Sequence, residues 1–349
     1  MKTFIELFAG AGMARLGLGP DWTCVLANDI DPKKGASYGA NFGRDHLKVC
    51  GVAALTLADV PAEPVDLVWM SPPCVGFSEA GDKQGFEEKQ SGAFWPAWRL
   101  IKGLVAEGRA PRAIIFENVT GLLSSHQCQD IALIREAFER AGYGHATLAI
   151  DAKHFVPQSR LRIFIVGAHG ETSEAMQALA KLTLAQLPKR ALDLVEVLDL
   201  DARNCAWEFS PAEVARHLEM MSPEQRVRVE EARASGRPVA GPFARRMRDI
   251  PGSTKREQRV EVRFDGVANA LRVAGGGGSS KQFVMIVHGP ETRMRAIQPP
   301  EAARLMGMPD NYVLPRDPTE ALSLAGDGVV VPVVRFLVEQ MIEEGSRSR

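Results

Sequence analysis

The sequence predicts an α/β fold in which a doubly wound, mostly parallel sheet is joined to a second, smaller domain. Short apolar segments recur along the first half of the chain, at residues 4–8, 23–27, 65–70, 113–116 and 162–166. Helical patterns lie between them, as in residues 131–141, where Ile131, Ile134 and Phe138 fall on one face. Strands that alternate with helices in this way favour a parallel sheet covered by helices on both faces.

The second domain is predicted from a change of pattern at about residue 170. Residues 170–292 are rich in Glu, Arg and Pro, show fewer clear strands and contain a glycine run at 275–278. Beyond them, residues 300–306 resemble a helix start and residues 329–342 a closing helix with one apolar face. We therefore expect one domain from residues 1–185 and 326–349, and a smaller one from residues 186–325.

Composition indicates a soluble globular protein of the cytoplasm. The hydrophobic share is 45% and the charged share 24%. The sequence contains no run of 18 or more apolar residues, so it predicts no transmembrane helix. The N-terminus lacks the pattern of a secretory signal. The five cysteines are widely spaced without a C-x-x-C pair, which argues against a disulfide framework and a structural zinc site.

Charge is balanced overall but not locally. The chain has 42 Lys and Arg against 43 Asp and Glu. Residues 245–263 nevertheless hold seven basic side chains: Arg245, Arg246, Arg248, Lys255, Arg256, Arg259 and Arg263. A local patch of this kind is compatible with a nucleic-acid partner, and a solvated loop is the alternative.

A glycine-containing turn follows the first predicted strand and indicates a nucleoside cofactor. Phe8, Gly10 and Gly12 form the pattern F-x-G-x-G, which permits a tight turn and close approach of a ligand to the backbone at a helix N-terminus. Asp29 follows about twenty residues later, at the end of the second strand, where a carboxylate can accept hydrogen bonds from a ribose diol.

A candidate nucleophile follows the strand at residues 65–70. Two prolines precede Cys74 in the segment Ser71-Pro72-Pro73-Cys74 and hold the loop in a fixed shape. The carboxyl end of a parallel strand is where open α/β sheets present reactive groups. By itself, however, an inert buried cysteine would be the commoner outcome.

Three charged residues complete the candidate site. Glu117 comes just after the strand at 113–116, where it would neighbour the Cys74 loop, although a capping or surface carboxylate is the alternative. Arg160 and Arg162 alternate along a strand start, so they are expected to point the same way and could clamp a base carbonyl or a phosphate. Surface salt bridges are the alternative for both.

Taken in order, these motifs resemble the DNA (cytosine-5) methyltransferase family. They are F-x-G-x-G, N-D-I-D, P-P-C-x-x-F-S, E-N-V and Q-x-R-x-R, followed by Arg295 to Glu301, Arg304 to Pro309, and Gly326 to Val329. The resemblance covers residues 4–167 and about 295–340. It implies a Rossmann-like methyltransferase domain at 1–185 and 326–349, with a target-recognition domain at 186–325.

The resemblance also implies a covalent mechanism. Cys74 would attack C6 of a cytosine, because this addition makes C5 nucleophilic. Glu117 would hold the N3 and N4 edge of the base, which requires a raised pKa if the carboxyl acts as an acid. Arg162 would hold the O2 carbonyl, and Arg160 would support the cysteine side.

The implied cofactor is S-adenosyl-L-methionine. Phe8 would pack on its adenine, Gly10 and Gly12 would border its methionine part, and Asp29 would take the ribose hydroxyls. Ile30 would contact the adenine where the family often has tryptophan, and Asp327 would lie near the methionine end.

The implied partner is double-stranded DNA, from which the target base is rotated into the site. Residues 245–263 are the expected phosphate-contacting face, and residues 275–278 would lie near the nucleic-acid backbone. We expect the chain to act as a monomer on DNA, without a metal ion or a membrane.

Four residues depart from the family pattern. Met13 replaces the last of three glycines, Val75 follows the cysteine in place of Gln, and Asp327 replaces an asparagine. Gly51 stands where an aspartate normally contacts the adenine amine. The loss of that contact should weaken cofactor binding by about 1.5–3 kcal/mol, the value of one charge-assisted hydrogen bond.

Three other functions fit part of the sequence. A tRNA-directed cytosine methyltransferase would share the catalytic motifs, but its characteristic Cys-Phe-Thr element is missing here and the recognition region is long. A catalytically silent DNA-binding relative would explain the cofactor-side departures. A nicotinamide-dependent oxidoreductase would explain the glycine turn but neither P-P-C nor E-N-V.

Overall fold

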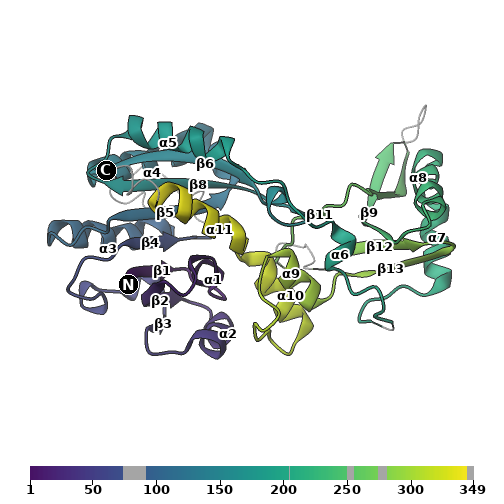
Figure 1. Ribbon diagram of the computed structural model, residues 1–349, viewed down its shortest axis with the longest axis horizontal. Coiled ribbons are helices and arrows are strands. Elements are labelled where there is room, and N and C mark those ends of the chain that lie inside the picture. The colour runs from purple at the N-terminus through teal and green to yellow at the C-terminus, as the bar shows by residue number, and fades with distance from the viewer. Residues whose placement is uncertain (74–91, 204, 250–254, 274–280, 344–349) are drawn as a thin grey trace. The chain divides into compact units, whose positions relative to one another are not determined.

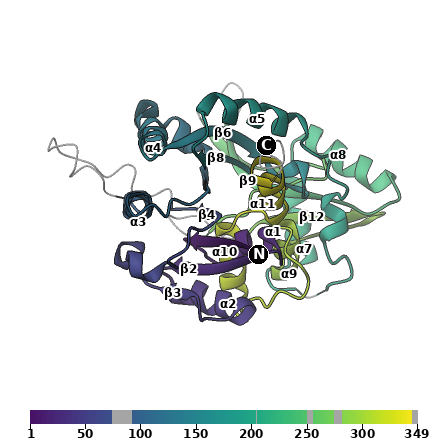
Figure 2. The same ribbon diagram turned by 60° about the vertical axis from the view of Figure 1, so that its left-hand side comes forward.

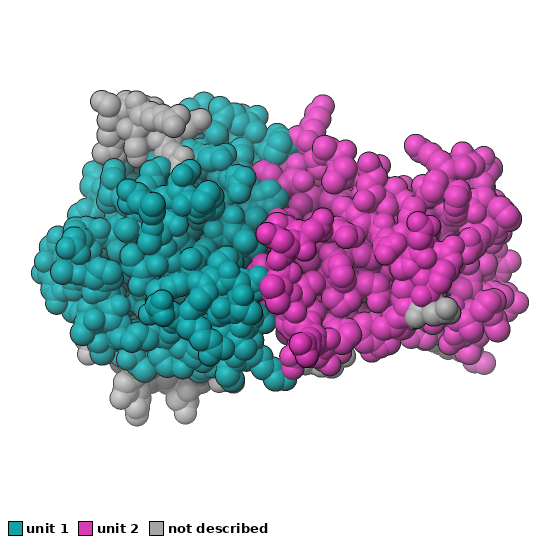
Figure 3. All heavy atoms as spheres, turned by 60° about the horizontal axis from the view of Figure 1, so that its bottom comes forward, with its two compact units in different colours: residues 1–151, 161–188, 328–349 teal, residues 152–160, 189–327 magenta. Residues whose placement is uncertain are grey.

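The computed structural model describes residues 1–73, 92–203, 205–249, 255–273 and 281–343 (Figure 1). The chain divides into two compact units, coloured separately in Figure 3. The first unit contains Met1–Asp151, Leu161–Pro188 and Gly328–Arg349, and the second contains Ala152–Arg160 and Lys189–Asp327. Each unit therefore draws on segments that are far apart in the sequence.

The first unit is built on a seven-stranded sheet of order β3-β2-β1-β4-β5-β8-β6. Its strands are β1 (Lys2–Leu7), β2 (Trp22–Asp29), β3 (Leu47–Val49), β4 (Leu67–Met70), β5 (Ala113–Val119), β6 (Tyr143–Asp151) and β8 (Leu161–His169). The first five strands run parallel, while β8 is antiparallel to both β5 and β6. The predicted doubly wound, mostly parallel sheet is confirmed.

Helices α3 (Phe94–Ala106) and α4 (Gln129–Arg140) cover one face of this sheet (Figure 2). Alternate strand residues point to this face and form one apolar core with both helices. In that core Trp98 of α3 stacks on Phe138 of α4, with ring centroids 4.8 Å apart. The helical pattern in residues 131–141 therefore marks a buried helix face, as predicted.

The opposite face carries α1 (Met13–Leu18), α5 (Ser173–Ala185) and α11 (Val331–Val338). Gly17 makes close packing of α1 on α11 possible, because a Cβ there would lie 2.5 Å from Cβ of Val334. The remaining helix, α2 (Pro32–Phe42), connects β2 to β3 and is capped by Asp31, whose side chain accepts a hydrogen bond from the backbone of Lys33. The closing helix is shorter than predicted, since a π-helical turn, Glu339–Glu343, replaces its end.

The second unit contains more strand than its sequence suggested. Its four-stranded antiparallel sheet has the order β10-β9-β12-β13, and a short parallel pair joins β7 and β11. The strands are β7 (Gln158–Ser159), β9 (Val239–Asp249), β10 (Arg256–Val262), β11 (Ala268–Asn269), β12 (Phe283–His288) and β13 (Glu291–Ala296). The sequence shows few clear strands here because five of the eleven β9 residues are exposed and only two of the seven β10 residues are buried, so neither strand has a continuous apolar pattern.

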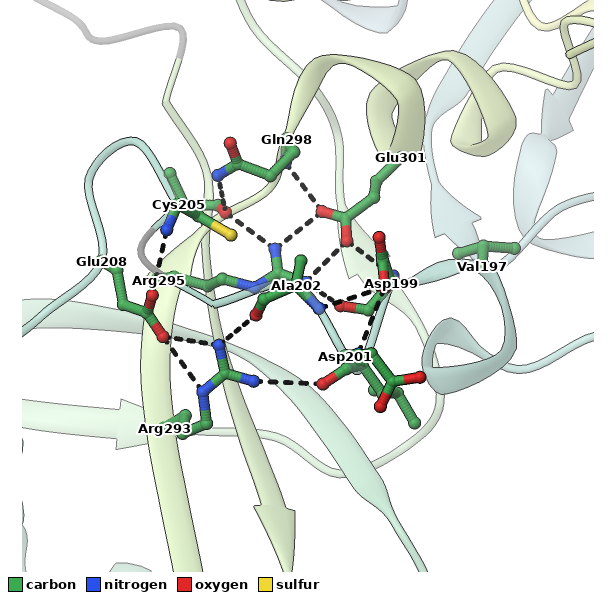
Figure 4. Close-up of polar contacts among 12 residues, drawn as sticks. Val197, Asp199, Asp201, Ala202, Cys205, Glu208, Arg293, Arg295, Gln298 and Glu301 are labelled. Atoms are coloured by element: carbon green, nitrogen blue, oxygen red, sulfur yellow. Dashed lines mark hydrogen bonds and ion pairs between the residues drawn. The ribbon is translucent and has the colours of Figure 1, made fainter.

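The α-helices described in this unit are α6 (Leu194–Val197), α7 (Pro211–Glu219), α8 (Pro223–Ala234), α9 (Pro299–Leu305) and α10 (Pro318–Asp327). Of these, α6, α7 and α8 pack on the four-stranded sheet, and α10 packs on α9. The start of α9 falls within one residue of its predicted position. A buried ion pair joins α9 to β13 (Figure 4), where Nη1 and Nη2 of Arg295 donate to the two carboxylate oxygens of Glu301 at 2.8 and 2.6 Å. The backbone of Asp199 contacts both side chains, so the pair also fixes the segment after α6.

One helical stretch, Pro318–Ile342, is long and apolar enough to cross a membrane by composition alone. It consists of two helices, α10 and α11, and 67% of its apolar window is buried inside the protein. Core helices of soluble proteins pass the same test, so the stretch is weak evidence for a membrane span.

Candidate active site

The candidate residues of the first unit gather at one edge of the sheet. The parallel strands β1, β2, β3, β4 and β5 all have their carboxyl ends at this edge, and the antiparallel β8 begins there. Phe8 follows β1, Ile30 follows β2 and Gly51 lies two residues after β3. Open α/β sheets bind ligands at this edge, which brings the predicted cofactor and base contacts into one neighbourhood.

The turn after β1 has the strained conformation that its glycines allow. Phe8, Gly10 and Gly12 have φ values of 59°, 54° and 74°, all in the left-handed region. A Cβ on Gly12 would lie 2.4 Å from the ring of Phe42, so only glycine fits between the turn and α2. Apart from its chain neighbours, no described residue has an atom within 4 Å of a Cβ placed on Gly10.

Asp29 braces this turn from the end of β2. Its Oδ2 accepts a hydrogen bond from the backbone N–H of Gly10 at 2.8 Å, and its Oδ1 accepts one from the backbone of Asp31 at 2.9 Å. The residue is 6% exposed. Because a carboxylate has about four acceptor positions, each oxygen can still accept a second hydrogen bond.

Glu6, which the sequence did not single out, lies beneath the same turn. It is 1% exposed, and its Oε1 accepts a hydrogen bond from the backbone of Arg15 in α1. Its Oε2 is buried and has no hydrogen-bond partner among the described residues. Burial raises the pKa of Glu6 to about 8, so the carboxyl is largely protonated at neutral pH. A glutamate inside an apolar strand was the signal that could have identified it.

The ends of β2 and β3 are tied together beside Asp29. The backbone N–H of Cys50 donates to the carbonyl of Asp29 at 3.0 Å, and Nδ2 of Asn28 donates to the carbonyl of Cys50 at 2.9 Å. Ile30 is 72% exposed there, and its Cδ1 atom would lie 3.7 Å from a Cβ on Gly51. Gly51, one of the four departures from the family pattern, is therefore adjacent to Ile30, the predicted adenine contact.

Glu117 and Arg162 face each other where β5 ends and β8 begins. Arg162 is in register with Val119, so its side chain emerges on the same face as that of Glu117. Nε of Arg162 lies 3.3 Å from Oε1 of Glu117, and the two side chains are only 19% and 11% exposed. The structure thus holds a carboxyl group and a guanidinium together in a sheltered position.

The segment leading to Cys74 begins beside this pair. Nδ2 of Asn118 donates to the carbonyl of Pro72 at 3.1 Å, and Nε1 of Trp69 donates to Oγ of Ser71 at 2.9 Å. Both bonds fix the chain where it leaves β4. Cys74 and Val75 themselves lie outside the described residues.

Arg160 and Asp327 belong to the second unit. Arg160 is 4% exposed and donates to the carbonyls of Leu271 at 2.9 Å and Gly326 at 3.0 Å. The sequence predicted that Arg160 and Arg162 alternate along one strand start, but Arg160 lies between β7 and β8 while Arg162 lies within β8. Asp327 ends α10 and is exposed, one residue after the carbonyl that Arg160 binds.

Within the basic stretch, residues 245–249 of β9 pair with residues 256–260 of β10 as a β-ribbon, so these parts are not loops. Several of its arginines pair with carboxylates. Arg248 donates to both oxygens of Glu261 at 2.5 and 2.7 Å, and Arg256 lies 3.1 Å from Asp249. The ribbon is therefore less positive than its arginine count suggests. The glycine run at 275–278 lies outside the described residues.

The family model for C-5 cytosine-specific DNA methylase matches residues 2–343, nearly the whole chain. The chain belongs to this family. Among its curated relatives, Type II methyltransferase M.NlaX of Neisseria lactamica is 28% identical, with 98% of this chain and 96% of the relative covered. Type II methyltransferase M.HpaII of Haemophilus parainfluenzae is 26% identical, with 98% and 89% covered. This C-5 methylase is thus similar to restriction–modification enzymes along their whole length.

Solved structures support the fold of this C-5 methylase. Dnmt2 methyltransferase from S. pombe aligns with a TM-score of 0.68 and 16% identity, covering 99% of both chains. A putative DNA modification methyltransferase encoded within an E. coli prophage aligns with a TM-score of 0.61 and 18% identity, covering 98% of this chain and 99% of the other.

Within the described residues, no group of three or more His, Cys, Asp or Glu side chains could hold a metal ion.

Proposed function

We propose that the chain is an S-adenosyl-L-methionine-dependent methyltransferase that modifies C5 of cytosine in double-stranded DNA. The observation that carries this proposal is the sheet edge itself. It brings together the braced glycine turn, the Glu117–Arg162 pair and the fixed start of the Cys74 segment, in a chain that matches the DNA methylase family from end to end.

The residues around the glycine turn fit the proposed cofactor. Asp29 retains acceptor positions for a ribose diol, Gly10 leaves the approach to the backbone open, and exposed Ile30 offers an apolar contact for a purine. When bound, S-adenosyl-L-methionine would supply an electrophilic methyl group. Phe8 and Gly12 would shape the rest of this side of the site, and Asp327 would contribute near the methionine end.

The remaining residues would act on the flipped base. Addition of the Cys74 thiolate to C6 breaks the aromaticity of the ring and makes C5 an enamine carbon. Glu117 would hold N3 and N4 as a hydrogen-bonding acid, and Arg162 would hold O2, with Arg160 supporting the loop side. After C5 carries the methyl group, loss of its proton expels the Cys74 thiolate and restores the aromatic ring.

The second unit would read the DNA around the target base, with the β9–β10 ribbon as the phosphate-contacting face. In this proposal residues 186–325 form the target-recognition domain and residues 1–185 with 326–349 the catalytic domain. The chain would work as a monomer, because one copy supplies both parts.

A covalent trap tests this mechanism. In DNA that carries 5-fluorocytosine, C5 has no proton to lose after methylation, so the bond to Cys74 cannot break. We expect a complex of protein and DNA that survives denaturation, requires S-adenosyl-L-methionine, and is absent for Cys74→Ala. A complex that forms equally well with Cys74→Ala would contradict the assigned nucleophile, and trapping on tRNA alone would contradict the assigned substrate.

A further inference from the structure

Gly51, beside Asp29, has no side chain that could accept a hydrogen bond from an amine. Ile30 is 72% exposed, and among the described residues, apart from its two chain neighbours, a Cβ on Gly51 would have only the Cδ1 atom of Ile30 within 4 Å, at 3.7 Å. We call Ile30 and Gly51 the β2–β3 shelf. Ile30 presents an aliphatic side chain on this surface, and Gly51 presents no side chain.

The shelf is held in place by the backbone. Cys50 donates to the carbonyl of Asp29 at 3.0 Å, while Asn28 donates to the carbonyls of Lys48 and Cys50 at 3.0 and 2.9 Å. The position of Ile30 and Gly51 next to Asp29 is therefore set by strand pairing.

The carboxylates nearest in sequence already have other partners. Asp29 accepts hydrogen bonds from Gly10 and Asp31, and Asp31 accepts one from the backbone of Lys33 as the cap of α2. Asp59 lies 3.1 Å from the ammonium group of Lys48. In these contacts, none of the three carboxylates lies at residue 51, where a carboxylate could accept a hydrogen bond from a purine amine.

We propose that this enzyme does not read the 6-position of the purine in its cofactor. The inference rests on the proposed function, since it assumes that the purine lies on the β2–β3 shelf beside the ribose contact of Asp29. Contact with Ile30 is non-directional and depends on buried apolar area, so it is nearly the same for a 6-amino, a 6-oxo or an N6-methyl purine. Gly51 has no side chain that would oppose the extra methyl group.

The expected difference in affinity is large enough to measure. A hydrogen bond between the 6-amino group and a carboxylate would favour adenine by on the order of tenfold to a hundredfold. Without it, the 6-amino, 6-oxo and N6-methyl forms should bind within about threefold of one another.

Gly51→Asp should create the missing discrimination without disturbing the fold. Gly51 has φ −61° and ψ 137°, which any residue can adopt, and it occupies the N-cap of the short helix Val52–Ala54. Aspartate is a favoured N-cap residue. Gly51→Ala is the matched control, because it adds a Cβ at the same place without an acceptor.

Isothermal titration of the full-length protein with S-adenosylhomocysteine and with its 6-oxo and N6-methyl counterparts tests the proposal. We expect the wild type and Gly51→Ala to bind all three within about threefold, and Gly51→Asp to prefer the adenine form by tenfold or more. A wild type that already prefers adenine by tenfold or more would overturn the inference and leave the proposed function intact. No binding of S-adenosylhomocysteine to the wild type would overturn the proposed function as well.

Discussion

Replacement of Glu301 by glutamine should strongly destabilise the second unit. The Glu301 carboxylate is almost fully buried and accepts four hydrogen bonds, two from the Arg295 guanidinium and one each from the backbones of Asp199 and Gln298. Arg295 is 0% exposed. Glutamine keeps the shape but removes the charge and points an N–H donor at groups that are themselves donors, so Arg295 is left as a buried cation without a counter-ion.

The magnitude follows from the burial of this pair. Loss of one partner from a buried ion pair costs about 3–5 kcal/mol, because the remaining charge stays desolvated. Glu230→Gln is a suitable control. Glu230 lies 2.8 Å from Arg233, but the two side chains are 66% and 29% exposed, so the same change there should cost less than about 1 kcal/mol.

Urea unfolding followed by tryptophan fluorescence measures both effects, since Trp207 reports on the second unit. We expect a clearly lower midpoint for Glu301→Gln and an almost unchanged midpoint for Glu230→Gln. Equal midpoints for the two variants would refute the reasoning, because burial would then make no difference to the cost.

Three further results are expected. Burial raises the pKa of Glu6 from 4.5 to about 8, so the folded state favours the protonated carboxyl. The free energy of unfolding should therefore fall as pH rises from 4.5 to 8, by at most about 1.4 kcal/mol per pH unit. Thermal melts of Glu6→Gln should lack this slope, and an identical slope would contradict the burial argument. Gly328→Ala should lower the free energy of unfolding by about 1–3 kcal/mol, because the new Cβ would lie 2.1 Å from Sδ of Met13. In a Met13→Ala background most of that loss should disappear. An undiminished loss there would show that the clash is elsewhere. Glu117→Gln should slow methylation by orders of magnitude. Its affinity for S-adenosylhomocysteine, measured by titration, should stay close to that of the wild type. A large loss of affinity would contradict the role given to Glu117.

The sequence predicted those parts of the fold in which local pattern and tertiary burial agree. The five predicted strands, β1, β2, β4, β5 and β8, are largely buried on both faces, so they appear as apolar runs between amphipathic helices. The antiparallel sheet of the second unit was missed because β9 is buried in its first half and exposed and charged over Arg245 to Asp249. Its pairing with β10 is a tertiary feature that no short pattern contains.

The sequence predicted where the candidate residues lie in the fold, but not which atoms they contact. The motifs placed Phe8, Asp29 and Glu117 at strand ends, and the sheet brings those ends to one edge. The sequence could not show that Glu6 is buried beneath the turn, since that depends on how α1 packs on β1. Nor could it show that Ile30 and Gly51 meet, because strand pairing between β2 and β3 decides it.

The roles of Cys74, Glu117, Arg160 and Arg162 stay predictions until activity is measured. The most direct test is to express the wild type and Cys74→Ala in a host without cytosine methylation and to sequence its genomic DNA after bisulfite conversion. We expect protected cytosines in one sequence context for the wild type and none for the variant. Complete conversion of cytosines with both proteins, at matched expression, would contradict the assignment of this chain as a DNA cytosine methyltransferase.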